Sequence, residues 1–324
     1  MTAPTPPTPR RNLAPIAWPV AALAIVVVAA ILAVAVGAMG PNRSAPAYAG
    51  DADASAALDV ATARLHHLDD DVAALSADAR RALSAVLAGD PAGLEVILSA
   101  GITRLGAIAD DRTSFAAAIA AVPGTGAGRE TRLSPPVIAR YDALGADGDL
   151  GKGLEVEWTE LASGARQAVT LAALLRRHDT ETATAATLGT EAKYAEASVA
   201  LDTPQATLVE AGKLRDALIS TTDVATLTTW LDANAIYDAA LRALYVALVA
   251  SGGTVNDAVR AAAATETAAR AGLPTDARAM TVVMSDVTHG GVNPHVIAIT
   301  KARTAIEAAI TALAGPASPS PAAS

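Results

Sequence analysis

An unbroken apolar run near the N-terminus constrains this chain most. No charged residue occurs from Leu13 to Met39, and residues 20–36 consist of Ala, Val, Ile and Leu. A helix that crosses a bilayer needs ~20 such residues, so the length predicts a transmembrane helix over residues 16–39. A buried core helix is a poor alternative, because the run is apolar on every face and the Pro/Thr-rich residues before it cannot cover it.

The charges around this run indicate its orientation. Arg10 and Arg11 precede it and only Arg43 follows closely, which favours an N-terminus inside the cell and the bulk of the chain outside. A cleaved signal peptide remains as the alternative, because Ala47-Tyr48-Ala49 resembles a cleavage site and would release a secreted chain starting at Gly50. The apolar run is longer than the ~7–15 residues of a typical signal peptide, which favours a retained anchor.

Composition predicts an all-α fold and excludes several function classes. The chain is rich in Ala and only 3% aromatic, which is typical of helices that pack by close backbone approach. Its net charge of −9 argues against binding to nucleic acid. The absence of Cys excludes disulfides, thiolate nucleophiles and Cys-ligated metals.

The order of segments predicts a single anchor followed by an extracytoplasmic multi-helix bundle. Gly and Pro clusters mark the boundaries. The predicted segments are a short cytoplasmic Pro/Thr-rich tail (1–15), the transmembrane helix (16–39), a linker (40–52), a helical hairpin (53–122), an irregular loop region (123–153), a helical bundle (154–314) and a disordered tail (315–324).

Two apolar stripes define the hairpin. Residues spaced three and four apart form an a/d stripe over 58–86, and a second stripe over 94–122 includes Ile102. The same stripes could instead drive coiled-coil oligomerisation. Farther along, residues 154–201 predict one long helix or two collinear ones, in which 179–192 is rich in Thr, Ala and Glu and predicts a solvated, frayed stretch. The helix that reaches Ala250 is expected to be the central element.

Asp286, His289 and His295 form the first candidate ligand site. His289 is followed by Gly290-Gly291 at a predicted helix end, and His295 lies in the first turn of the next helix. A tight turn between these helices would bring the two His side chains together, a geometry that suits a metal or a pH-sensitive contact. The structural alternative is a pair of His residues that cap and border a turn.

Two further groups carry weaker ligand-binding signals. Asn234 and Asp238 share a face of the helix that ends at Ala250 and could bind a ligand, or could pair with Arg242, Lys213 or Arg215 and fix helix register. His66, His67 and Asp70 could contribute to a metal site, since side chains three and four apart meet on a helix. Their neighbours Leu65 and Leu68 belong to the apolar stripe, which favours a solvated face instead.

These patterns favour a non-enzymatic interaction or binding module, anchored through residues 16–39 in the lipid bilayer, with an envelope protein or polymer as its partner. The phosphate-loop, calcium-hand, serine-hydrolase and His-Glu-x-x-His patterns do not occur in the sequence, and no cofactor is predicted. The alternative is a metal- or ligand-binding sensor or enzyme that uses Asp286, His289 and His295.

Overall fold

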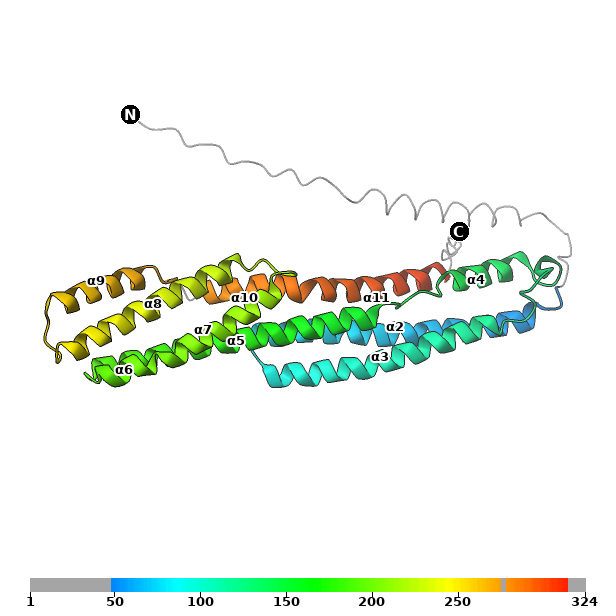
Figure 1. Cartoon of the computed structure of the whole chain (residues 1–324). Helices are drawn as coiled ribbons and strands as arrows, with labels where there is room; N and C mark the ends of the chain where they lie inside the picture. Colours follow the sequence, from blue (N-terminus) through cyan, green and yellow to red (C-terminus); the bar gives the residue numbers. More distant parts are fainter. Residues whose placement is uncertain (1–47, 275–277, 314–324) are drawn as a thin grey trace, which may run out of the picture. The chain divides into compact units, whose positions relative to one another are not determined.

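The computed structural model describes residues 48–274 and 278–313, and the regular secondary structure of these residues is helical, with no strand among them. The all-α prediction is therefore confirmed for this part of the chain. The predicted tail 1–15, the transmembrane helix 16–39, most of the linker and the C-terminal tail 315–324 lie outside the described residues. Figure 1 shows how the helices of the described residues are arranged.

The helices follow one another through short connections. Their bounds are α2 (Asp51–Ala88), α3 (Pro91–Ala120), the 3-10 helix η1 (Arg129–Thr131), α4 (Pro135–Ala146), α5 (Leu154–Thr190), α6 (Tyr194–Ala200), α7 (Asp202–Leu218), α8 (Ala225–Ala250), α9 (Asp257–Ala271), α10 (Arg278–Gly291) and α11 (Asn293–Leu313). Helix α4 and η1 occupy part of the region 123–153, which the sequence predicts as mostly irregular.

Helices α2 and α3 pack against each other as an antiparallel hairpin (Figure 1). Gly89 ends α2 in a left-handed conformation, and the Asp90 carboxylate then accepts a hydrogen bond from the Gly93 N–H to cap α3. The α2 stripe from Leu58 to Val86 is buried throughout. Because this stripe is used inside one chain, it is not free for the coiled-coil oligomer considered above.

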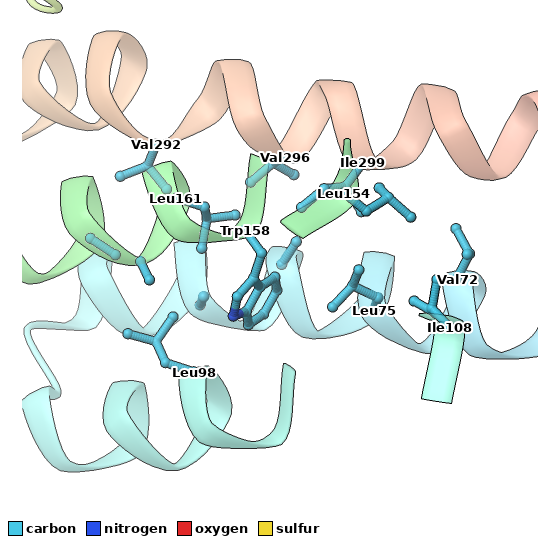
Figure 2. Packing of buried hydrophobic residues seen from close by; sticks show 14 of the residues in the cluster. Val72, Leu75, Leu98, Ile108, Leu154, Trp158, Leu161, Val292, Val296 and Ile299 are labelled. Carbon is cyan, nitrogen blue, oxygen red and sulfur yellow. The ribbon is translucent and has the colours of Figure 1, made fainter. Parts of the chain in front are cut away.

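The α3 stripe departs from the sequence prediction at one position. Ile102 is 61% exposed, whereas the preceding Gly101 is buried. A Cβ on Gly101 would lie 1.9 Å from the ring of Trp158, so the indole rests directly on bare backbone. Figure 2 shows Trp158 pointing from α5 toward α3, near Leu98 and Leu161. The large ring fills the space that an Ile at the inward position would need.

Helix α5 is the central element of the described residues, not α8 as predicted. It contacts α2, α3, α6, α7, α10 and α11. It also continues unbroken to Thr190 through the segment expected to fray. That segment is ordered because Ala185 is buried in a second small core with Ala197, Leu201, Leu241 and Tyr245 from α6 to α8.

The last two helices do not fold back on each other as predicted. Only Val292 separates α10 from α11, and Gly290 and Gly291 do not adopt the left-handed conformation of a helix-ending glycine. These glycines instead allow close packing: a Cβ on Gly164 of α5 would lie 2.1 Å from the Gly291 carbonyl oxygen. Helix-breaking residues therefore serve here as contact points between helices.

Two described helices, α3 and α8, are long and apolar enough to cross a membrane when judged by length and composition alone. The sequence predicts a single anchor, and so no such segment after residue 39. Both helices pack against their neighbours, and the core helix of a soluble protein passes the same test. This finding is weak evidence for membrane spans at α3 or α8.

Replacing Ala192 with Gly should stabilise the fold by about 0.5–1 kcal/mol. Ala192 follows α5 with a φ of 60°, where an L-residue with a side chain is strained by roughly 1–2 kcal/mol, and Gly is not. Chemical denaturation followed by circular dichroism measures the change. The matched control is Ala195→Gly, inside α6, which should lower stability by about the same amount. A change in the free energy of unfolding that has the same sign in both variants would contradict this account of Ala192.

Candidate functional site

A buried ion pair joins α5 to α8. Nε2 of His178 lies 2.9 Å from Oδ2 of Asp238, and the hydroxyl of Thr182 donates to Oδ1 of the same carboxylate at 3.3 Å. His178 and Asp238 are 1% and 4% exposed. The ring of Trp230 packs against the imidazole in an edge-on arrangement, with centroids 5.4 Å apart. The pair is therefore shielded from water by residues of both helices.

His178 is held in its protonated form. Burial lowers the pKa of the imidazole, but the carboxylates of Asp179 and Asp238 outweigh burial and raise the pKa to about 9. Oδ1 of Asp179 lies 3.5 Å from Nδ1 of the imidazole. At neutral pH the protonated Nε2 thus donates its hydrogen bond to Oδ2 of Asp238.

Stability should fall as the pH rises from 6.5 through about 9. A His whose pKa is raised on folding stabilises the native state fully below its unfolded pKa of 6.5, and this contribution is lost as the pH passes the folded value of about 9. The shift corresponds to a contribution of the order of 3 kcal/mol. Denaturation curves at several pH values measure it. The Asp238→Asn variant should show a much flatter dependence, and an equally steep one would contradict the assignment to His178.

His178 is a site residue that the sequence analysis misses. It lies three residues after Leu175, and the buried face of α5 continues through His178 to Ala185. The sequence signal for a buried His178 is its place in the three- and four-residue spacing of the buried side chains of α5. The polar composition after residue 178 conceals this spacing. Because the composition predicts a frayed stretch from residue 179 onward, the sequence indicates no partner for His178.

The exposed surface next to this ion pair contains a pocket of about 440 Å³ between α7 and α8. We use the term α7–α8 face for the residues that line or border it on the outside: Gln205, Val209, Gly212 and Arg215 on α7, and Asp232, Ala235, Ile236, Ala239 and Arg242 on α8. Val209 and Ile236 are 56% and 62% exposed. Asp238 also lines the pocket while its carboxylate binds His178. The ion pair therefore holds one wall of the pocket against α5.

Asn234 and Asp238 are both buried on α8, as their shared face predicts, but their side chains have different partners. The side-chain amide of Asn234 donates to the Trp230 carbonyl oxygen at 2.8 Å, within its own helix. The partners predicted for Asp238 are wrong, because it pairs with His178, while Arg242 pairs with Asp202 at 2.6 Å. Arg215 binds the adjacent carboxylate of Asp216. Asp238 does form a pair that fixes the register of two helices, as the structural alternative predicts, but its partner is His178.

Asp286, His289 and His295 have different surroundings. Asp286 accepts a hydrogen bond from the Thr226 hydroxyl of α8 at 3.0 Å, and Nδ1 of His295 lies 2.9 Å from Oε2 of Glu157 on α5. His289 is exposed at the end of α10. Because α10 leads almost directly into α11, the turn that was to bring the two His side chains together is not present. Ligand binding by the three residues stays a prediction.

His66, His67 and Asp70 are all exposed on α2, next to the buried Leu65 and Leu68. Within the part of the chain that the structure describes, no group of three or more His, Asp or Glu side chains is arranged to hold a metal ion. His66, His67 and Asp70 thus lie on the solvated face of α2, as their position beside the apolar stripe predicts.

The arrangement combines a rigid buried pair with an exposed apolar surface. The protonated His178 is fully buried, and its role is to hold two helices in position. The adjoining α7–α8 face contains a pocket with charged groups at both ends. Such a surface suits binding of another molecule. Comparison with known proteins finds no match among protein-family models, curated proteins or solved structures.

Proposed function

We propose that this chain is a membrane-anchored interaction module. Residues 16–39 would form a single transmembrane helix with the N-terminus inside and the helical part outside the cell, where it would meet an envelope partner. The apolar run and the basic residues before it support this topology. The secreted alternative would require cleavage after Ala49.

The observation that carries the interaction role is the α7–α8 face. Apolar side chains that gather around a pocket on a protein surface mark a contact site for another molecule, whereas isolated ones do not. Val209 and Ile236 are exposed beside the pocket, and Ala235 and Ala239 leave the backbone of α8 accessible between them. The buried His178–Asp238 pair keeps this face in a fixed geometry.

Photo-crosslinking in intact cells tests this role. A photoreactive amino acid in place of Ala239 should form covalent adducts of defined size, because this position lies in the proposed contact. The matched control is Ala107, an exposed residue of the same type on α3, which should form none. Adducts that are equal at the two positions, or absent at both, would contradict the interaction role of the α7–α8 face.

Protease digestion tests the topology independently. With the proposed orientation, protease added outside intact cells or spheroplasts should cleave the helical part, while an epitope tag before Arg10 stays protected until the membrane is opened. A protected helical part would contradict an extracytoplasmic location.

A further inference from the structure

We propose that the α7–α8 face binds the same face of a second copy of this chain, in an antiparallel arrangement with two-fold symmetry. This inference rests on the proposed function, since it names the partner of that surface. In a two-fold interface, each residue and its contact occur twice, so the surface must be complementary to itself. The α7–α8 face meets this requirement in charge and in shape.

The charges on α8 are the first argument. Asp232 lies at one end of the pocket and Arg242 at the other, ten residues apart, which is about 15 Å along a helix. A two-fold axis that crosses α8 midway between them places Asp232 of one copy opposite Arg242 of the other, and the reverse pair forms by symmetry. Asp232 thus gains a partner of opposite sign, and Arg242, which binds Asp202 of its own chain, gains a second one.

The charges on α7 follow the opposite order, and the same axis pairs them. Asp202 begins α7 beside Arg242, and Arg215 lies near the other end of α7, beside the Asp232 end of the pocket. Antiparallel pairing places Asp202 of one copy opposite Arg215 of the other. Asp216 uses only Nε and Nη2 of Arg215, so this guanidinium has further N–H donors for a second carboxylate. Each end of the interface would then alternate acidic and basic groups.

The shape of the face is the second argument. Near the axis, Ala235 of one copy meets Ala239 of the other, and two such small side chains let helix backbones approach closely. On α7, a Cβ on Gly212 would meet nothing within 4 Å. The axis that pairs Asp202 with Arg215 brings Gln205 of each copy opposite Gly212 of the other, so that a longer side chain enters an open position.

The overall charge of the chain is compatible with pairing through this face. With a net charge of −9, two copies repel each other on average. The ends of the α7–α8 face carry Asp232, Arg215 and Arg242, with Asp202 bound to Arg242, and the carboxylate of Asp238 is already neutralised by His178. Pairing through a face that carries both signs of charge at each end limits this repulsion.

Charge reversal and mixing provide the test. In the full chain, extracted in mild detergent, Asp232→Arg alone and Arg242→Asp alone should each weaken self-association by at least about tenfold, because each substitution creates two like-charge contacts. An equimolar mixture of the two variants should associate again, since each contact then joins opposite charges. Copurification of two differently tagged chains measures the association of each single variant and of their mixture. Asp110→Arg, the same charge change on an exposed α3 position, should leave the association unchanged.

Introduced thiols test the register. The chain has no Cys, so each introduced thiol is unique. A mixture of Ala235→Cys and Ala239→Cys chains should oxidise mainly to the mixed disulfide, in preference to a dimer of either variant. A monomeric wild-type chain, or association that none of the substitutions changes, would overturn the proposal. An adduct between the photoreactive Ala239 position and a different protein would overturn the proposal while supporting the interaction role.

Discussion

Replacing Asp238 with Ala should lower the free energy of unfolding by about 3–5 kcal/mol. The substitution removes the carboxylate that faces His178 at 2.9 Å and leaves a buried imidazole without its main partner. An uncompensated buried charge is expensive, because the protein interior solvates it poorly. Chemical denaturation of the purified protein, followed by far-UV circular dichroism, measures the loss.

Two further variants separate the ion pair from other effects. Asp179→Asn removes a carboxylate that is 60% exposed and should change stability by no more than about 0.5 kcal/mol. The double variant His178→Leu/Asp238→Leu replaces both charges with apolar groups and should recover most of the stability that Asp238→Ala loses. An Asp238→Ala protein that unfolds at the wild-type midpoint would contradict the structural role of the pair.

Gly101→Ala should destabilise the fold by about 1–3 kcal/mol, the cost of adding a methyl group to a filled core. The new Cβ would lie 1.9 Å from the Trp158 ring, which is 1% exposed and has no room to move away. The same denaturation measurement applies. The matched control is Gly106→Ala, also in α3, where a Cβ meets nothing within 4 Å.

The two glycines should respond with opposite signs. Gly106→Ala should stabilise the protein by roughly 0.5–1 kcal/mol, because Ala is the better residue inside a helix. Combining Gly101→Ala with Trp158→Phe should restore part of the lost stability, since Phe lacks the indole atoms that the new methyl group contacts. Stabilisation by both glycine substitutions would show that Trp158 does not pack on Gly101.

Regular spacing makes much of this fold predictable from the sequence. The buried stripe of α2 and the cap formed by Gly89, Asp90 and Pro91 follow from local rules of helix formation. Such rules work where the residues that decide the structure are close in the chain. They do not predict that Ile102 turns outward, because that depends on Trp158, which comes from another helix.

The candidate site depends even more on distant residues. Asp238 is recognisable as an acidic residue on an apolar helix face, but its partner His178 lies sixty positions earlier in a segment with a polar composition. Gly290 and Gly291 have the sequence signature of a helix end and serve instead for close packing against Thr222 and Gly164. The α7–α8 face arises only when two helices pair, and no single helix contains it.

Native mass spectrometry of the full chain, released from membranes in mild detergent, most directly tests an anchored interaction module. One spectrum reports whether residues 1–49 are retained, how many protein chains are bound together and whether any other mass is bound. We expect uncleaved chains in an assembly made of protein subunits. A single chain that starts at Gly50, or a single chain that carries a small molecule or metal lost on His295→Ala, would contradict the proposal.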